Sequence, residues 1–332
     1  MKFLAVLFLS LFTEAHVVAQ QTAVYAAVLS TKSFVVGGKN PMTGLFFQRP
    51  SDDTLWQHSG APNVRVSGVA VKVEHPLGGK LLYLAAGNGV HRSTDGGATW
   101  KIVTDWRVTE VQWVTIDPRN SSVVYIATPY GVFKSSDGGN AWKEMSRGLE
   151  ASHFISSIIV DVVNSNIVYC STEDGAYISR DAAATWQRMG LSVGGVRVIA
   201  QDPDNPKTLA VGTEDNGIYI SHDGGEVWMK KESGVDHSTF YTVVFDPHDS
   251  RILYAGGYVT GVYKSTDSGE SWRRTNDGLT CLNVHSIAVD PANSNRIYAA
   301  SMGDGVFRSD DGGAHWKFAG LRNAEVWRLA IQ

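Results

Sequence analysis

The sequence has little cysteine, little proline and no excess of basic charge. Its 2 cysteines in 332 residues are too few for a disulfide framework or a four-thiolate zinc site. Lys and Arg together number 29 against 33 Asp and Glu, and the net charge of −4 argues against a general nucleic-acid-binding protein. Phosphate-binding glycine loops and histidines at metal-ligand spacing are missing, so we expect no cofactor and no metal.

Long apolar runs are also missing. The most apolar stretch, Phe3 to Phe12, has ten residues interrupted only by Ser10, whereas a transmembrane helix needs about 20. It follows the positive start Met1-Lys2, and small or modest residues precede Gln20. This pattern predicts a signal peptide over residues 1–19, cleaved after Ala19, with no transmembrane segment. We therefore expect a secreted or periplasmic, extracytoplasmic protein.

Glycine and tryptophan are abundant instead, with 34 and 10 residues, and the tryptophans are periodic. Six copies of a pattern with Ser, an Asp two places later and Trp at the end are separated by 42 or 44 residues. The copies are Ser93–Trp100, Ser135–Trp142, Ser179–Trp186, Ser221–Trp228, Ser265–Trp272 and Ser309–Trp316. One further step back lies Trp56, in a degenerate seventh copy.

Four short apolar stretches recur in each period of about 43 residues. In the last period they are Ser286–Asp290, Ile297–Ser301, Val306–Ser309 and a stretch through Trp316, each bounded by Gly, Asn or Asp. Four strands per period are typical of a β-propeller blade. Residues 20–332 divide into about seven such units. We predict an all-β protein with one seven-bladed β-propeller of four-stranded antiparallel blades, rather than two domains.

The end of the chain predicts how the ring closes. Val326–Ile331 resembles the first strand of a repeat, and nothing follows it to complete another blade. We expect this strand to join the N-terminal strands between Phe34 and Trp56, so that no open edge remains. Ala23–Leu29 is the alternative candidate for the closing strand. Deleting Val326–Gln332 is predicted to abolish cooperative unfolding.

The repeated Asp is interpreted as structural. An Asp side chain accepts hydrogen bonds from backbone N–H groups a few residues on, glycine supplies positive φ, and Trp fills space between blades. The third copy has Ala182-Ala183 where each of the others carries at least one Gly, so its turn should be strained or differently shaped. The residues assigned to this role are Asp95, Asp137, Asp181, Asp223, Asp267, Asp311, Trp100, Trp142, Trp186, Trp228, Trp272 and Trp316.

The pattern Ser-x-Asp-x-Gly-x-Thr-Trp resembles the Asp-box, or bacterial neuraminidase repeat. Propellers that carry it include sialidases, xyloglucan-cleaving glycosidases, sortilin-type receptors and photosystem II assembly factors. The resemblance covers nearly all of residues 20–332 and implies the fold. It does not select a function, because the box stabilises blades in enzymes and in binding proteins alike.

Because successive strands of a blade run in opposite directions, strand parity (odd- or even-numbered strands) assigns the loops alternately to two faces of the ring. The Asp-boxes and the Asp-Pro turns fall on one face, and the other face is formed by the loops after each second strand and by the segments that link blades. We expect any central pocket on this other face. Its candidate ligand-binding residues are Trp106, Arg107, Trp113, Tyr130, Arg197, His237, Tyr258, His285 and Arg328, with Tyr241 and His153 in the same linking segments. For Trp113 and Trp327, packing within strands is an alternative role.

Two functional hypotheses follow. The main hypothesis is a secreted, monomeric and non-catalytic propeller that binds a protein or a glycan. The alternative is a glycoside hydrolase, sialidase- or xyloglucanase-like, that acts on extracellular glycans and uses paired carboxylates. Its first suspects are Glu173, Asp174, Glu214 and Asp215. The sialidase resemblance implies an arginine cluster, for which Arg65, Arg107, Arg197 and Arg328 are candidates; the early Phe47-Gln48-Arg49-Pro50 matches the sialidase segment poorly.

Overall fold

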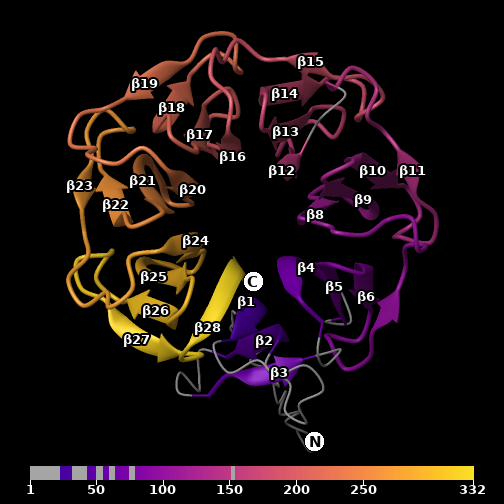
Figure 1. The fold of residues 1–332 in the computed structure, drawn as a ribbon, viewed down its shortest axis with the longest axis horizontal. Coiled ribbons are helices and arrows are strands. Elements are labelled where there is room, and N and C mark those ends of the chain that lie inside the picture. The colour runs from indigo at the N-terminus through magenta and orange to yellow at the C-terminus, as the bar shows by residue number, and fades with distance from the viewer. Residues whose placement is uncertain (1–22, 32–42, 50–54, 60–63, 75–78, 151–153) are drawn as a thin grey trace, which may run out of the picture.

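A computed structural model shows a ring of seven β-sheets (Figure 1). It describes residues 23–31, 43–49, 55–59, 64–74, 79–150 and 154–332. The expected signal peptide, His153 and most of the segment from Phe34 to Trp56 lie outside these ranges. The described residues form seven four-stranded antiparallel sheets and no helix, which confirms the predicted fold class. None of their elements is a helix long and apolar enough to cross a membrane.

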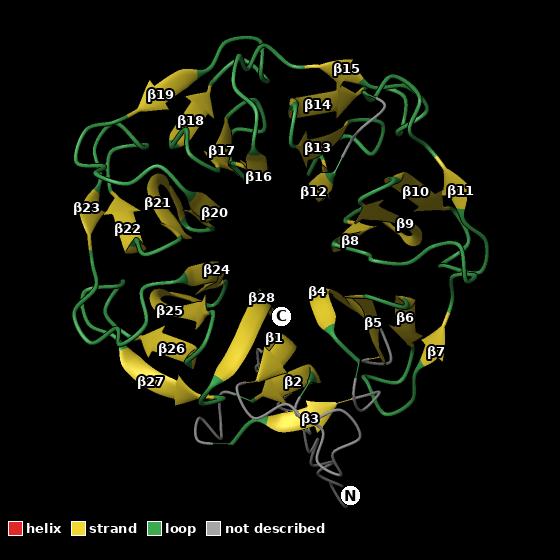
Figure 2. Cartoon of the chain, viewed as in Figure 1, coloured by secondary structure: helices red, strands yellow, loops and turns green. Residues whose placement is uncertain are grey.

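Each blade places its strands in the same order from the channel outward, with the loops between them (Figure 2). The innermost strands are β4 (Val66–Glu74), β8 (Trp113–Asp117), β12 (Ile155–Val160), β16 (Val196–Gln201), β20 (Phe240–Asp246), β24 (Val284–Asp290) and β28 (Ala324–Ile331). The second strands are β1 (Val24–Thr31), β5 (Gly79–Ala86), β9 (Asn120–Thr128), β13 (Val168–Thr172), β17 (Leu209–Thr213), β21 (Asp249–Gly257) and β25 (Asn293–Ser301).

The outer half of each blade is shorter and more exposed. The third strands are β2 (Gly44–Gln48), β6 (Gly89–Ser93), β10 (Gly131–Ser135), β14 (Gly175–Ser179), β18 (Ile218–Ser221), β22 (Gly261–Ser265) and β26 (Gly305–Ser309). The outermost strands are β3 (Gln57–Ser59), β7 (Lys101–Ile102), β11 (Lys143–Glu144), β15 (Gln187–Arg188), β19 (Met229–Lys231), β23 (Arg273–Arg274) and β27 (Lys317–Gly320).

The core lies between blades. Every residue of β13 and of β17 is buried, because neighbouring blades cover both faces of a second strand. This explains why these strands are runs of apolar and small residues rather than alternating ones. Second-strand tyrosines reach the next blade: Tyr83 donates a hydrogen bond to the carbonyl of Gly138 (2.8 Å), and Tyr254 donates one to Gly312 (3.1 Å).

The ring is closed by the last strand. β28 pairs antiparallel with β1 and takes the innermost place of the N-terminal blade, beside the chain end near the channel (Figure 1). Val326–Ile331 is the closing strand as expected, but its partner is β1, which contains most of Ala23–Leu29, and not a strand between Phe34 and Trp56. β2, from that segment, is the next strand outward. Trp56 completes the closure, since its indole N–H donates to the carbonyl of Ala319 in the last blade (2.7 Å).

The six Asp-boxes share one hydrogen-bond pattern. In the first, Ser93 Oγ donates to Asp95 Oδ1 (2.7 Å) and accepts from the N–H of Gly97 (2.8 Å), while both carboxylate oxygens accept from Thr99 (2.9 and 2.5 Å). These bonds lower the pKa of Asp95 to about 2. Three box tryptophans donate to the preceding blade, as Trp142 does to Val103 (2.9 Å), whereas the other three donate to a glycine carbonyl of their own box, as Trp100 does to Gly97 (3.0 Å).

The expected strain in the third box is present. Ala182 and Ala183 have φ of 57° and 71°, in the left-handed region that is unfavourable for residues with a Cβ. Ala183 is fully buried, against the core cluster that includes Trp186. Its methyl group therefore contributes packing that a glycine at this position would lack.

Candidate functional site

A bulge near the start of five inner strands leaves one residue of each strand without a partner in the ladder. The ladder between first and second strands shifts register at Val66/Gly68, Ile155/Ser157, Val196/Val198, Phe240/Thr242 and Val284/Ser286. In each case the residue before the bulge is fully or almost fully buried. The bulged residue itself, such as Arg197, Tyr241 or His285, has no ladder partner and is free to point inward.

Several of these residues, with their neighbours, line one cavity of about 350 Å³, which we call the central cavity. It lies where the inner strands begin, on the face formed by the second-strand loops and the linking segments, here called the second face. The cavity is lined by Gln112, Phe154, Ser156, Arg197, Glu214, Tyr241, His285, Trp327 and Arg328. A central cavity on the second face agrees with the expectation from strand parity.

Aromatic rings form one wall of the central cavity. Tyr241, His285 and Trp327 come from the consecutive inner strands β20, β24 and β28, and their ring centroids are 4.3 and 4.6 Å apart in turn. Burial, reinforced by the charge of Arg328, lowers the pKa of His285 to about 3. The imidazole is therefore neutral at physiological pH and acts as part of an uncharged stack.

Arg328 lies between the two ends of the channel. It lines the central cavity and also an apolar recess of about 490 Å³ that continues toward the Asp-box face. Its guanidinium carbon is 3.6 Å from the ring centroid of Trp113. Trp113 is in β8, two blades away around the ring, and the intervening strand β4 carries Gly68 at the equivalent place after the bulge. A Cβ at Gly68 would contact Ala85 Cβ (3.2 Å) and the backbone of Gln112 and Trp113, so the glycine allows β8 to lie close to β4.

One of the two arginines that line the central cavity has an ion-pair partner among the described residues and the other does not. Arg197 forms an ion pair with Glu214, a residue of the β17–β18 loop. Arg328 has no ion pair or side-chain hydrogen bond with any residue in the described ranges, and its Nε is buried without a partner. Burial lowers the pKa of Arg328 to about 9, so the guanidinium remains charged at neutral pH. The described lining residues carry a net charge of about +1 at neutral pH.

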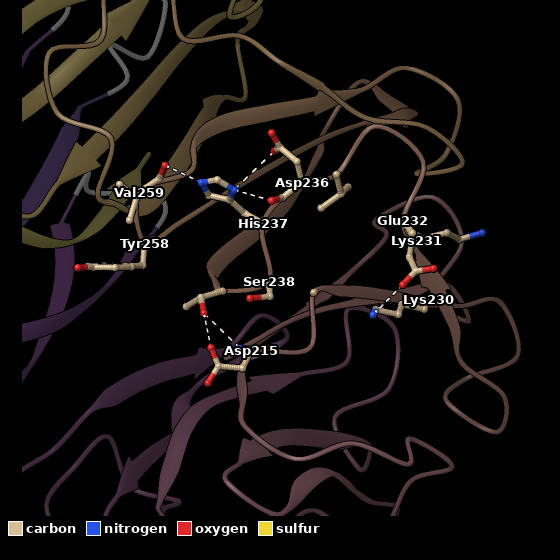
Figure 3. Close-up of a pocket in the computed structure, with 12 residues that line it drawn as sticks. Asp215, Lys230, Lys231, Glu232, Asp236, His237, Ser238, Tyr258 and Val259 are labelled. Carbon is tan, nitrogen blue, oxygen red and sulfur yellow. Dashed lines mark hydrogen bonds and ion pairs between the residues drawn. The ribbon is translucent and has the colours of Figure 1, made fainter.

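A second cavity, of about 590 Å³, lies farther out on the second face between the blades of β16–β19 and β20–β23; we call it the rim cavity (Figure 3). It brings together Asp215, His237 and Tyr258 from the sequence-based candidates. His237 contacts the carbonyl of Val259 (3.1 Å), and Asp215 accepts a hydrogen bond from Thr239 (3.1 Å). These contacts tie the three loops to one another.

Other candidates are exposed on second-face loops, apart from both cavities. Trp106 is 85% exposed and Tyr130 is 56% exposed; Tyr130 donates a hydrogen bond to Glu110 (2.9 Å). Arg107 pairs with Asp105 at 2.6 Å and does not line either cavity. Of the four arginines considered as a cluster, Arg197 and Arg328 meet in the central cavity, whereas Arg65 and Arg107 do not line it.

The four suspect carboxylates have different surroundings. Glu214 is paired with Arg197, and Asp215 is bonded to Thr239 and has a positive φ of 67°. Asp174 has one carboxylate oxygen that is buried without a partner, and its backbone carbonyl accepts from Arg188. Glu214 alone of the four lines the central cavity. In the described part of the chain, no group of three or more His, Cys, Asp and Glu residues is placed to hold a metal ion.

Sequence reasoning did not select Gln112, Phe154 and Ser156 and did not anticipate the apolar recess. The missed signal is positional, because Ser156, Arg197, Tyr241 and His285 each directly follow the buried residue that precedes a bulge. The recess is lined mainly by residues of the inner strands, and at this end of the ring Ser165 donates a hydrogen bond to Asp117 of the preceding blade (3.0 Å).

Comparisons with known proteins bear on this site. A family model described as photosynthesis system II assembly factor YCF48 matches residues 70–326. A structure of YCF48 bound to D1 peptide has a TM-score of 0.63 and 14% identity, covering 82% of this chain and 94% of that one. No curated protein matches the sequence significantly.

Two glycosidase structures are also similar. The GH74 xyloglucanase from Xanthomonas campestris has a TM-score of 0.69 and 16% identity over 91% of this chain and 53% of that one. A GH74 enzyme of Niastella koreensis has a TM-score of 0.63 and 23% identity over 78% and 45%. This chain thus spans about half the length of these two enzymes, and at such identities the likeness shows a shared propeller fold.

Proposed function

Because the chain belongs to the family of the photosynthesis system II assembly factor YCF48, we propose that it is a non-catalytic propeller that binds a polypeptide segment at the central cavity. A family relative of known structure, YCF48, was determined with a D1 peptide bound. We further propose that the chain works outside the cytoplasm after cleavage following Ala19, on the basis of the pattern of residues 1–19.

The observation that carries the proposal is the concentration of aromatic side chains on the second face. Trp106, Tyr130 and Tyr258 are all more than half exposed on its loops. The Tyr241–His285–Trp327 stack lines the cavity at its centre. Exposed aromatic residues around a concave centre are typical of protein-binding surfaces, where a few aromatic anchors supply most of the binding energy.

The charged groups support binding rather than hydrolysis. A glycosidase needs one carboxylic acid and one carboxylate across a bond to be cleaved. In the central cavity Glu214 is the one described carboxylate, and Arg197 pairs with it. Asp215 faces the rim cavity instead. These surroundings favour a fixed recognition surface.

The test selects peptides from a random phage-displayed library on the intact protein and measures their affinities by calorimetry. Trp327→Ala and His285→Ala should weaken binding of the selected peptides at least about tenfold, the loss typical of removing an interface anchor. The matched control is Val227→Ala, which removes an apolar residue that is 63% exposed in an Asp-box on the opposite face.

Two results would count against the proposal. Selected peptides that bind the cavity variants and the control equally would place the interface elsewhere. Turnover of a chromogenic glycoside panel that is abolished by Asp174→Asn or Asp215→Asn, with folding intact, would instead identify a glycoside hydrolase.

A further inference from the structure

The guanidinium of Arg328 is one of the unsatisfied polar groups of the central cavity, together with Ser156 Oγ and Arg197 Nε in the described part of the chain. It is stacked on Trp113 at 3.6 Å, yet no acceptor in the described residues receives a hydrogen bond from its nitrogens, and Nε is buried. Arg328 is half-buried, and a cation that is partly withdrawn from water without a carboxylate or carbonyl partner is less stable than a paired one, because burial removes part of its hydration. A methionine would fill the same space without this cost.

The described residues around Arg328 do not neutralise its charge. The residues that occupy the equivalent place after the bulge in other inner strands include Gly68, Ser157, Val198, Thr242 and Ser286, none of which is charged. The neighbouring Arg197 already has Glu214 as its partner. The aromatic stack next to Arg328 is uncharged at neutral pH because His285 is neutral there.

We propose that Arg328 binds the carboxylate of a ligand that enters the central cavity from the second face, with a flat apolar group of the ligand lying against Trp327, His285 and Tyr241. This inference rests on the proposed function for the location of the ligand and adds its chemistry. The planar guanidinium offers parallel N–H donors that match the two oxygens of a carboxylate.

The charge of the cavity selects the class of anion. With Arg197 and Glu214 paired, a monoanion neutralises the single remaining positive charge. A phosphate monoester carries close to two negative charges at neutral pH and would leave an excess negative charge in a buried site. The shared chemistry is therefore a carboxylate next to an aromatic or other flat apolar body. Its source is either the C-terminal residue of a polypeptide or a free carboxylic acid.

The experiment titrates the intact protein with sodium benzoate and with benzamide at constant ionic strength, while tryptophan fluorescence reports on Trp113 and Trp327. Benzoate should produce a saturable change and benzamide, its neutral analogue, should not. Arg328→Gln should lower benzoate affinity at least about tenfold, as expected for loss of a charge-assisted hydrogen bond. Arg251→Gln, at an exposed arginine paired with Asp249 on the opposite face, is the control and should leave the affinity unchanged.

A second pair of probes distinguishes the sources. N-acetyl-Gly-Phe with a free carboxylate is compared with the same dipeptide amidated. Binding of the acid alone identifies a polypeptide C-terminus, whereas binding of benzoate but not of the dipeptide acid identifies a small carboxylic acid. Both outcomes support the carboxylate site, and the second counts against the polypeptide ligand of the proposed function.

Other outcomes overturn the inference. Equal affinity for benzoate and benzamide, no binding of either carboxylate probe, or benzoate binding unchanged in Arg328→Gln would show that Arg328 does not bind carboxylates. Thermal melts of each variant confirm that it is folded, and Arg328→Lys provides a second test if Arg328→Gln fails to fold. Lys retains the charge without the planar fork, so its benzoate affinity should fall between that of the wild type and zero. Phage-selected peptides that need Trp327 but not Arg328 would leave the proposed function standing while refuting this inference.

Discussion

Removal of the closing strand should unfold the ring. Deleting Ala324–Gln332 leaves the N-terminal blade with three strands and exposes the edge of β1 along its paired residues from Val24 to Thr31. The strand also carries Val326 and Leu329, which are 0% and 6% exposed. The deletion therefore removes backbone pairing and core packing together.

The magnitude follows from this burial. Burying a valine or leucine side chain contributes about 1.5–3 kcal/mol, so these two residues account for about 3–6 kcal/mol. The total stability of a natural domain is about 5–15 kcal/mol. The loss of β28 thus removes a large share of the free energy of unfolding, even before its backbone pairing is counted.

The assay combines thermal melting and urea unfolding with peptide complementation. The truncated chain should show no cooperative transition, and Val326→Ala in the full chain should lower the free energy of unfolding by about 2 kcal/mol. A synthetic peptide of residues 324–332 should restore a transition by adding the missing strand. The same peptide with Val326→Asp is the control and should not. A truncated chain that melts cooperatively at the wild-type temperature would refute this account of closure.

Three further predictions concern local chemistry. Ala182→Gly should raise the free energy of unfolding in urea by about 1 kcal/mol, because it relieves the strain of a left-handed backbone conformation. Ala183→Gly should stabilise the protein less, because it also removes a buried methyl group worth about 0.8 kcal/mol. Equal effects of the two substitutions would contradict this prediction. The pKa of Asp95 and of Asp181 is lowered to about 2, so the contribution of each carboxylate to stability is present above the ordinary pKa of 3.8 and is lost as the pH falls through about 2. Asp95→Asn should therefore reduce the pH dependence of the free energy of unfolding in urea between pH 4 and pH 2. An unchanged pH dependence would contradict this role of Asp95. Glu214→Gln frees Arg197 and should tighten benzoate binding several-fold in the fluorescence titration, whereas weaker binding would show that the ion pair shapes the cavity instead.

The architecture was predictable from the sequence because it is repeated. Each blade contributes its own Asp-box, so Trp100, Trp142 and their equivalents reveal the period without knowledge of long-range contacts. Strand parity then assigns every loop to a face. The strain at Ala182 and Ala183 was predictable for the same reason, since five related turns show what the position requires.

The composition of the site was less predictable because it depends on departures from the repeat. Trp113 and Arg328 are 215 positions apart in sequence numbering and lie in inner strands separated by β4, yet their side chains are in contact. Arg197 and Arg107 look alike in sequence, yet one faces the channel and the other pairs with Asp105 on an exposed loop. The bulge near the start of these inner strands has no residue signature of its own.

The central claim is that a polypeptide binds at the channel mouth on the second face. Hydrogen–deuterium exchange of the intact protein with and without a phage-selected peptide tests it most directly. We expect slower exchange at the start of the inner strands, around Gln112, Arg197, Tyr241, His285 and Trp327, and unchanged exchange in the Asp-boxes. Protection confined to the Asp-box face or to the outermost strands would contradict it.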